Sequence, residues 1–338
     1  MRSLLLIFVT LLTPAPFARA EEREPPRIIF DTDMDSDCDD AGALAMLHVL
    51  ADRGEAELLA TICSARHAWS PACVDAINGW YGRPDLPIGV PREGATTASK
   101  YARELAESFP HDTPTDLAKI PSSVDVYRRA LSAQPDGSVT IVTVGDLTNV
   151  AALLKAPAEG DQPSGRDLAA KKVKLWVCMG GNFIGRPAVD DLKLGNNNFT
   201  VDAESSYEAV RNWPGEIVFV GREIGSVPSG LAVGARLKEL PENHPVRFAY
   251  AAYFGGEPRD RHVADQTAVL YAVRGLGPYW GGEVRGTMHL ARDMTFRFEE
   301  SADGGHRYVV QAPLDSPEDD ARVEQAIEEL MTASPAAR

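Results

Sequence analysis

Short apolar runs alternate with amphipathic stretches along most of this chain, and this alternation restricts the possible folds strongly. Apolar runs of about four to eight residues are typical of buried strands, and longer amphipathic stretches are typical of helices that pack on a sheet. Their alternation predicts βαβ units, in which the strands are parallel. We therefore expect an α/β fold, an open and mostly parallel Rossmann-like sheet with helices on both faces.

The predicted elements begin at Arg27 and continue to the C-terminus. Strands are expected at Arg27–Asp31, Ala56–Cys63, Leu86–Val90, Val139–Val144, Val173–Met179 and Ile217–Gly221. Helices are expected at Asp40–Arg53, Pro71–Tyr81, Val124–Ala133, Leu147–Leu154, Ala203–Asn212, His244–Phe254, Asp265–Val273 and Ser316–Ala333. Polar stretches at Ala156–Asp167 and Gly181–Asn198 interrupt this pattern. No Pro/Gly-rich linker divides the chain, so residues 21–338 are expected to form a single domain.

The first 20 residues have the pattern of a signal peptide. Arg2 precedes a short apolar stretch, residues 3–12, and Ala18-Arg19-Ala20 matches a small-x-small cleavage site. The apolar stretch is too short to anchor the protein in a membrane. We expect export to the periplasm or the medium, with cleavage near Ala20.

The chain is strongly acidic, with 49 Asp and Glu against 34 Lys and Arg. Cleavage would remove Arg2 and Arg19 and change the formal net charge from −15 to −17. Nucleic acids and anionic membranes are bound by basic patches, so we expect neither as a partner.

The four cysteines leave two interpretations open. Export would permit disulfides, and Cys63 with Cys73 is the nearest sensible pair. However, Cys63 and Cys178 lie in apolar runs, where a buried free thiol is more common. The spacing of the four residues does not match a zinc site.

Six aspartates occur within the ten residues from Asp31 to Asp40, directly after the apolar run Ile28–Phe30. Carboxylates crowded together at a strand end either take raised pKa values or bind a cation. Oxygen ligands favour Ca²⁺ or Mg²⁺ over Zn²⁺. A solvated acidic loop is the alternative interpretation, but the buried strand before the run argues against it.

Polar residues follow the other predicted strands as well. Because ligands of an open parallel sheet bind beyond the carboxyl ends of its strands, these residues should share one rim. Carboxylates, amides and glycines on that rim predict a polar, hydroxyl-rich ligand. Candidate ligand contacts on this rim are His67, Asn196, Asn198 and Glu223, and His262, shortly before the predicted helix Asp265–Val273, is a further candidate.

Five segments in order resemble the nucleoside N-ribohydrolases, the inosine–uridine preferring nucleoside hydrolase family. The segments are Asp31-Thr32-Asp33 with Asp39-Asp40-Ala41, Gly145 to Ala151, Met179-Gly180-Gly181, Asn198 with Asp202-Ala203-Glu204, and Asp265 to Ala268. The resemblance covers roughly residues 27–274. It implies a parallel-sheet α/β fold and a Ca²⁺-dependent enzyme that hydrolyses the N-glycosidic bond of ribonucleosides, as a homodimer or homotetramer.

The resemblance also implies a role for individual residues. Asp33 matches the general base, which also contacts the metal. Asp39 and Asn198 match residues that hold the ribose. The other expected metal ligands are Asp40, the backbone carbonyl of Val144, and Asp265. A hard cation would hold the sugar hydroxyls and acidify a water, and a carboxylate would take the proton of that water.

This chain departs from the family pattern at three places. Its acidic loop is two residues longer than usual, so Asp35 and Asp37 are interpreted as solvated turn residues. Asn196 stands near the position of a sugar-binding glutamate in better-known members. Ala264 stands where those members carry a histidine that helps to protonate the leaving base.

These departures keep two alternatives open. One is an exported, metal-dependent sugar- or nucleoside-binding protein with weakened catalysis. The other is a haloacid-dehalogenase-type phosphatase. The segment Ile28-Ile29-Phe30-Asp31-x-Asp33 resembles the first motif of those enzymes, and Asp31 would then be the nucleophile. In the hydrolase interpretation, Asp31 instead braces the loop by accepting hydrogen bonds from backbone amides of the following turn.

The remaining histidines and one tryptophan are assigned by their context. We expect His48 and Trp176 in the core, because both lie in apolar elements. We expect the other four histidines at the surface, namely His111, His244, His289 and His306.

Overall fold

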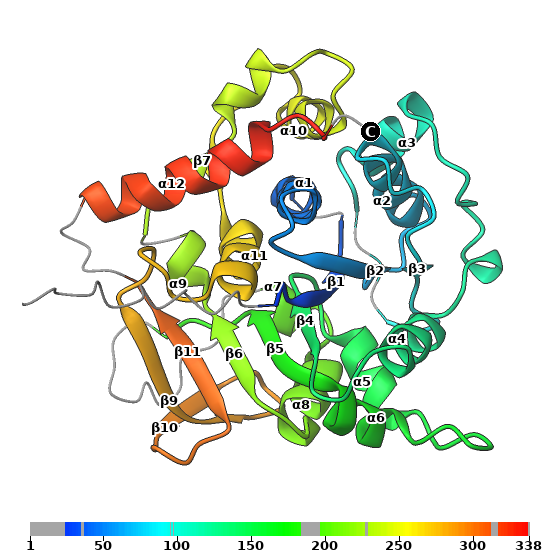
Figure 1. The fold of residues 1–338 in the computed structure, drawn as a ribbon, viewed down its shortest axis with the longest axis vertical. Helices are drawn as coiled ribbons and strands as arrows, with labels where there is room; N and C mark the ends of the chain where they lie inside the picture. The colour runs from blue at the N-terminus through cyan, green and yellow to red at the C-terminus, as the bar shows by residue number, and fades with distance from the viewer. Residues whose placement is uncertain are drawn as a thin grey trace, which may run out of the picture.

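The computed structural model of the protein describes residues 24–34, 37–94, 96, 98–183, 197–226, 229–311 and 317–336. Its main sheet is formed by β1 (Arg27–Thr32), β2 (Glu57–Cys63), β3 (Ile88–Gly89), β4 (Val139–Thr143), β5 (Val173–Met179), β6 (Ile217–Val220), β9 (Gly282–Leu290), β10 (Phe296–Glu300) and β11 (His306–Val310). The strand order is β10-β9-β11-β6-β5-β4-β1-β2-β3 (Figure 1). The strands from β11 to β3 are parallel, whereas β9 pairs antiparallel with both β10 and β11.

Helices cover both faces of this sheet (Figure 1). One face carries α1 (Asp39–Asp52), α2 (Ser70–Trp80), α3 (Ala102–Ser108), α10 (Pro245–Phe254), α11 (Ala264–Arg274) and α12 (Pro317–Thr332). The other carries α4 (Ser123–Ser132), α5 (Thr148–Lys155), α6 (Gly165–Lys172) and α8 (Ala203–Asn212). The short elements are η1 (Leu117–Lys119), α7 (Asn197–Thr200), α9 (Arg222–Gly225), η2 (Ala235–Glu239), and a separate two-stranded sheet of β7 (Ala232–Val233) and β8 (Arg261–His262). This arrangement confirms the predicted α/β class.

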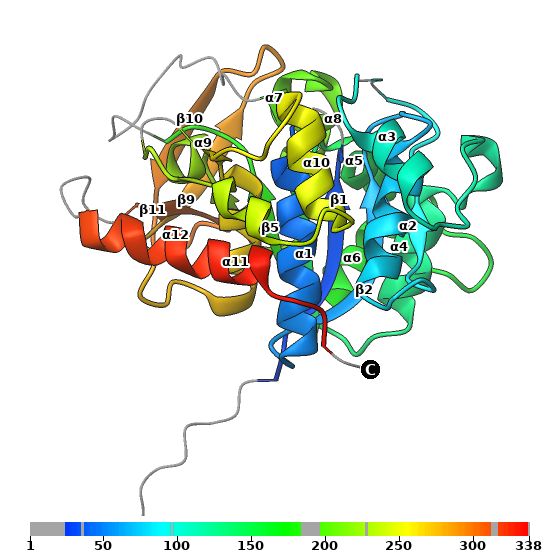
Figure 2. The ribbon, with the colours of Figure 1, turned by 90° about the horizontal axis from the view of Figure 1, so that it is seen from above.

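Alternation along the strands separates the core into two parts. In β1, Ile28 and Phe30 pack toward α1, and Ile29 packs toward the helices of the opposite face. Helix α1 is buried along most of its length, because α12 also packs on it and on α11 (Figure 2). Its apolar residues therefore face several neighbours, and it lacks the one-sided pattern of a surface helix.

The expected strands and helices are all present, and their observed ends lie within two residues of the predicted ones. The antiparallel strands β9 to β11 and the helices α3 and α6 were not predicted. The expected polar interruption at Ala156–Asp167 ends inside α6, which Ser164 caps by accepting a hydrogen bond from the backbone N–H of Asp167. Strands β9 to β11 lie at the sheet edge, where half-exposed and charged positions weaken the apolar pattern.

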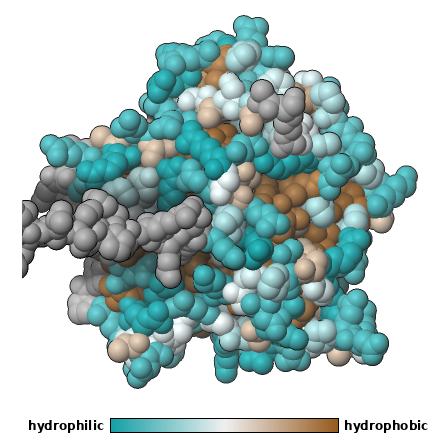
Figure 3. Space-filling model, in the orientation of Figure 1, coloured by the Kyte–Doolittle hydropathy of each residue, from teal (hydrophilic) through white to brown (hydrophobic). Residues whose placement is uncertain are grey.

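All four cysteines are buried free thiols, so the Cys63–Cys73 disulfide does not form. No helix among the described residues is long and apolar enough to cross a membrane. The face seen in Figure 3 is mostly hydrophilic, apart from an apolar area right of its centre.

The structure confirms His48 and Trp176 as core residues and corrects the prediction for His244. His244 is 2% exposed, and its ring meets the rings of Trp80 and Tyr81 edge-on. Neither ring nitrogen has a hydrogen-bond partner among the described residues. His244 directly precedes α10, where its ring turns inward.

We expect acidification to destabilise the fold through His244. Burial lowers the pKa of His244 from 6.5 to about 4, so the folded protein holds this ring neutral where the unfolded chain protonates it. Its contribution to stability is full above pH 6.5 and is lost as the pH falls toward 4, at a cost of about 3 kcal/mol. Denaturant unfolding of wild type and His244→Phe between pH 7 and 4 measures this. On acidification, the free energy of unfolding of wild type should fall more than that of the variant. An equal fall in both proteins would contradict the destabilising role of His244.

Candidate active site at the carboxyl ends of the strands

The loop after β1 folds back onto the start of α1. The Thr32 hydroxyl donates to Asp40 Oδ1, and the Met34 N–H lies 3.1 Å from Thr32 Oγ1 and 3.2 Å from Asp40 Oδ1. Met34 has a φ of 45°, an uncommon backbone conformation for a residue with a side chain. This turn brings the Asp33 side chain into hydrogen-bonding contact with Asp40.

Three buried aspartates from two helices form the centre of the site. Asp39 and Asp40 lie in the first turn of α1, and Asp265 lies in the first turn of α11. One carboxylate oxygen from each lies within 4.8 Å of the others. The charges thus gather beside the N-termini of two helices, where helix dipoles favour negative charge.

Burial and mutual repulsion hold these groups far from their usual ionisation. Burial and the Asp39 charge raise the pKa of Asp40 to about 7. The pKa of Asp265 is raised well above its usual value by burial and by the neighbouring aspartates. Burial and the Asp37 charge also raise the pKa of Asp39. Such a cluster is costly unless protons or a cation neutralise it.

The ends of β4 and β5 complete the opposite side of the site. The Asn198 side-chain amide donates to the carbonyl of Val144 at 2.6 Å and to that of Met179 at 3.2 Å. Val144 in turn donates its N–H to the carbonyl of Asp31 in β1. The predicted ribose-binding amide and the predicted carbonyl ligand are therefore in direct contact.

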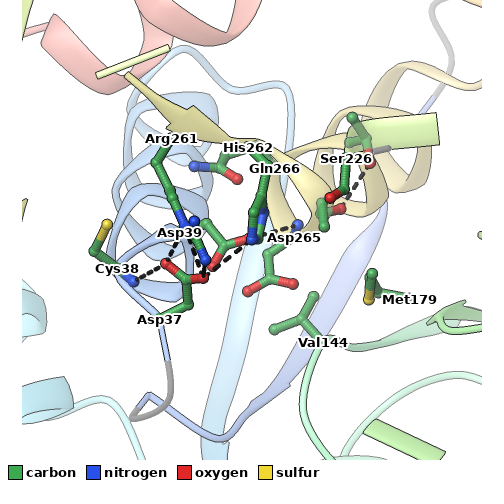
Figure 4. Close-up of polar contacts among 12 residues, drawn as sticks. Asp37, Cys38, Asp39, Val144, Met179, Ser226, Arg261, His262, Asp265 and Gln266 are labelled. Atoms are coloured by element: carbon green, nitrogen blue, oxygen red, sulfur yellow. Dashed lines mark hydrogen bonds and ion pairs between the residues drawn. The ribbon is translucent and has the colours of Figure 1, made fainter. Parts of the chain in front are cut away.

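A cavity of about 200 Å³ opens between these elements (Figure 4). It is lined by Asp33, Asp37, Asp39, Asp40, Val144, Met179, Asn198, Arg222, Ser226, Arg261, His262, Ala264 and Asp265. The structure thus brings together Asp33, Asp39, Asp40, Val144, Asn198, His262 and Asp265, all predicted as site residues from the sequence.

Two predicted contacts lie elsewhere, and a third is outside the described residues. His67 does not line the cavity, and its Nδ1 lies 3.4 Å from the Trp69 N–H and 3.3 Å from the Ser70 hydroxyl. Glu223 is buried in α9 with its carboxylate folded against Gly221, so it is also not a lining residue. Asn196 belongs to the residues that the structure does not describe.

The hydrogen-bond partners of Asp31 differ from the predicted ones. Among the described residues, its carboxylate accepts hydrogen bonds from side chains rather than from turn amides, namely from the Tyr127 hydroxyl at 2.7 Å and the Asn149 amide at 3.0 Å. Burial raises the pKa of Asp31 to about 8, although these two hydrogen bonds act to lower it. Because Asp31 is 1% exposed and does not line the cavity, it is not placed as the nucleophile of a phosphatase.

Asp37 is not the solvated turn residue that we expected. Arg261 Nε lies 2.9 Å from both of its carboxylate oxygens, and His262 Nε2 lies 3.0 Å from Oδ2 (Figure 4). Burial opposes ionisation, but these two cationic partners hold the pKa of Asp37 well below its usual value. The partners come from 224 residues further along the chain, so no local pattern indicated them.

His262 carries a positive charge at neutral pH. Burial disfavours the charged ring, but contacts with Asp37 and Asp39 outweigh it and raise the pKa of His262 to about 9. The distance from its Nδ1 to Asp39 Oδ2 is 3.3 Å. Sequence reasoning also missed Arg222, Ser226 and Met179, which reach the cavity through the packing of α9 and β5.

Gly145 allows the end of β4 to approach β1 closely. A Cβ atom at this position would lie 2.3 Å from the Ser64 hydroxyl and 2.5 Å from the backbone nitrogen of Asp33. Neither atom belongs to a long side chain that could move aside. The close approach places Val144 and Asp33 on the same cavity.

We expect Gly145→Ala to lower activity about 100-fold or more and to destabilise the protein by about 1–3 kcal/mol. The added methyl group displaces the backbone at Asp33, and a shift of about 1 Å in a catalytic group can have such an effect. The measurements are steady-state kinetics and denaturant unfolding. Gly256→Ala is the control, because a Cβ there meets no atom within 4 Å. Unchanged kinetics in Gly145→Ala would show that the contact does not position Asp33.

Comparisons with known proteins agree with this geometry. Residues 28–328 match the family model of the inosine-uridine preferring nucleoside hydrolases. No curated protein sequence gives a significant match.

Solved structures resemble the fold over almost its whole length. A plant nucleoside hydrolase has a TM-score of 0.66 at 18% identity, covering 91% of this chain and 99% of its own. The inosine-uridine preferring nucleoside hydrolase of Bacillus anthracis has a TM-score of 0.60 at 16% identity, covering 90% and 99%. The type III effector protein XopQ, complexed with adenosine diphosphate ribose, has a TM-score of 0.65 at 15% identity, covering 93% and 95%. With the family model spanning most of the sequence, this chain belongs to the inosine-uridine preferring nucleoside hydrolase family, a family of glycosidases that hydrolyse N-glycosyl compounds.

Proposed function

We propose that this protein is a Ca²⁺-dependent hydrolase of ribonucleosides or related ribosyl compounds, with Asp33 as the general base. The observation that carries this proposal is the position of Asp33, which contacts a buried cluster of three aspartates and lines the same cavity. Its 7% exposure leaves the carboxylate accessible to a water in that cavity. Membership of the nucleoside hydrolase family supports N-ribohydrolase activity.

The residues present fit a hard divalent cation. Asp39, Asp40 and Asp265 supply oxygen donors only, and burial together with repulsion from neighbouring aspartates raises the pKa of each. Oxygen donors in a flexible arrangement are typical of Ca²⁺ sites. We propose Asp33, Asp40, Asp265 and the Val144 carbonyl as metal ligands. The Val144 carbonyl oxygen has two lone pairs, so it can accept the hydrogen bond from Asn198 and still face a cation.

The side chains of this chain divide the chemistry between them. When bound, a divalent cation would supply positive charge that orients sugar hydroxyls and acidifies a nearby water. Asp33 accepts a proton from the attacking water. The water oxygen bonds to C1′ of the sugar as the C1′–N bond breaks. Asp39 accepts hydrogen bonds from the ribose hydroxyls, and the Asn198 amide donates to them. The surrounding carboxylates stabilise the positive charge that develops on the sugar.

Among the described residues that line the cavity, neither Ala264 nor His262 replaces the histidine that better-known members carry at the position of Ala264. The methyl group of Ala264 cannot donate a proton, and both ring nitrogens of His262 contact carboxylates. We therefore propose that the departing base takes its proton from water. This predicts the highest activity on substrates whose base is a good leaving group without protonation by the protein.

The purified protein should release free base and ribose from a panel of ribonucleosides in the presence of Ca²⁺. The panel includes inosine, uridine and adenosine diphosphate ribose, the last because XopQ forms a complex with it. Binding without release would favour the alternative of a sugar- or nucleoside-binding protein. Phosphate release from phosphoesters that depends on Mg²⁺ and Asp31 would favour a phosphatase.

We also propose that the protein is exported. The support is the pattern of residues 1–20, which lie outside the described residues. Mass spectrometry of the protein recovered from the periplasm or the medium should show a new N-terminus close to Ala20. A full-length chain confined to the cell interior would contradict export, and light scattering of the same sample tests the proposed homodimer or homotetramer.

A further inference from the structure

Asp37 connects the acidic loop to a distant part of the chain. Its side chain is 14% exposed and sits between the backbone N–H of Cys38, which donates to Oδ1 at 2.7 Å, and the guanidinium of Arg261. Arg261 belongs to β8, which also holds His262 and leads directly into α11. The contact therefore joins the start of α1 to the segment that places Asp265 in the site.

His262 bridges two carboxylates of the acidic loop. Its Nε2 lies 3.0 Å from Asp37 Oδ2, and its Nδ1 lies 3.3 Å from Asp39 Oδ2 (Figure 4). The backbone N–H of Asp265 lies 3.5 Å from the same oxygen of Asp39. One oxygen of Asp39 thus faces β8 and α11.

We propose that Asp37 is a positioning residue, which holds His262 against Asp39 so that the Asp39 carboxylate keeps the orientation needed to bind ribose. This inference rests on the proposed function, because it takes Asp39 as a ribose-binding carboxylate. Asp37, Arg261 and His262 are together called the Asp37 clamp below.

The Asp39 carboxylate needs such a constraint. The terminal torsion of an aspartate side chain is broad, so the carboxylate turns easily. The neighbouring carboxylates of Asp40 and Asp265 repel it. A cationic ring on one side favours a single orientation, and charge-assisted contacts are stronger than neutral ones.

Asp37 lies two residues before Asp39, so it can meet Arg261 of β8 while Asp39 begins the first turn of α1. Arg261 neutralises Asp37, and both residues line the cavity.

An ion pair at the opposite end of α1 provides a matched control. Asp52 and Arg83 form a 2.7 Å contact with side-chain exposures of 10% and 19%, against 14% and 33% for Asp37 and Arg261. Both pairs tie one end of α1 to another element. A 14-residue helix is about 20 Å long, so Asp52 is remote from the cavity. A purely structural role would make the two aspartates behave alike.

The experiment compares Asp37→Asn and Asp52→Asn in the purified protein with Ca²⁺ and the best nucleoside of the panel. We expect Asp37→Asn to raise KM at least tenfold with kcat within threefold of wild type. Asp52→Asn should leave KM within twofold of wild type, while both variants lower the melting temperature by a similar amount. Equal KM values in the two variants would overturn the proposal.

A double-mutant cycle tests whether Asp37 acts through His262. In a His262→Ala background, Asp37→Asn should change KM less than threefold, because the ring that it positions is gone. A tenfold effect that persists in this background would overturn the proposal. His262→Asn is the conservative variant, because its amide can still reach Asp39, and it should retain a lower KM than His262→Ala.

Two further readouts keep the result decisive. If Asp37→Asn does not fold, Arg261→Lys decides, because it keeps the charge but loses the two-oxygen contact; we expect a KM at least threefold higher, and an unchanged KM would overturn the proposal. If wild type binds the nucleoside without cleaving it, the proposed hydrolysis fails, and dissociation constants from calorimetry replace KM in the same comparisons. If wild type neither cleaves nor binds any nucleoside, Asp39 is not a ribose ligand and both proposals fail.

Discussion

Asp33→Ala is expected to lower kcat for nucleoside hydrolysis by about 10³-fold or more while the protein remains folded. A positioned general base contributes roughly 10² to 10⁴ in rate, and Asp33 is also a proposed metal ligand. Among the aspartates of the site, Asp33 contacts Asp40 and is more exposed than Asp39, Asp40 and Asp265. Its removal takes away one charge from a repelling group, so the folded state should not suffer. Steady-state kinetics with thermal unfolding checks both statements.

Asp33→Asn separates the two roles of this residue. Its amide cannot accept the proton of the attacking water, but its oxygen can still face a cation. We expect activity as low as in Asp33→Ala, with a smaller loss of Ca²⁺ affinity measured by calorimetry. Asp303→Asn, at the exposed turn between β10 and β11, is the control and should retain full activity. Full activity in Asp33→Ala would reject the assignment of the general base.

Removal of divalent cations is expected to abolish hydrolysis and to destabilise the protein. Asp39, Asp40 and Asp265 are 5% exposed or less, and burial together with mutual repulsion raises the pKa of each. A cation that binds only the folded state stabilises it by about 2.7 kcal/mol at 100 times its dissociation constant. Addition of Ca²⁺ to chelator-treated protein should therefore raise the melting temperature and restore turnover.

Asp265→Asn should remove most of the stabilisation that Ca²⁺ gives to wild type. The variant loses one charge from the buried cluster, so without cations it should be at least as stable as wild type. Because it also loses a ligand, Ca²⁺ should stabilise it little, and activity should fall about 100-fold or more. Parallel titrations with Ca²⁺, Mg²⁺ and Zn²⁺ identify the preferred ion. Full activity after chelation, with no thermal effect of any of the three ions, would exclude a metal centre.

The sequence predicted the parallel part of the fold well. Strands such as β1 and β5 are apolar runs between polar residues, and their burial on both faces leaves little ambiguity. The strands β9 to β11 were missed because their exposed positions carry charges, such as Arg285 and Glu299, that weaken the pattern. Their place in the sheet depends on pairing with β6, which is distant in sequence.

The candidate site was predictable where its residues follow strands or begin helices. Asp33 and Val144 directly follow β1 and β4, and Asp39, Asp40 and Asp265 lie in the first turns of helices. His67 and Glu223 also follow predicted strands, but they do not line the cavity. Local packing turns the His67 ring toward Ser70 and the Glu223 carboxylate toward Gly221, which a strand-end rule cannot foresee.

The sequence alone determined the α/β architecture and the rim on which an oxygen-rich site would form, because periodicity and strand ends are local properties. Only the tertiary structure decided how the described aspartates of the acidic run, Asp31, Asp33, Asp37, Asp39 and Asp40, are placed. Asp31 turns into the core toward Tyr127 and Asn149, whereas Asp37 meets Arg261 and His262 from the far end of the chain. The roles of identical side chains depend on burial and on partners distant in sequence, and these become fixed only when α1, β8 and α11 pack together.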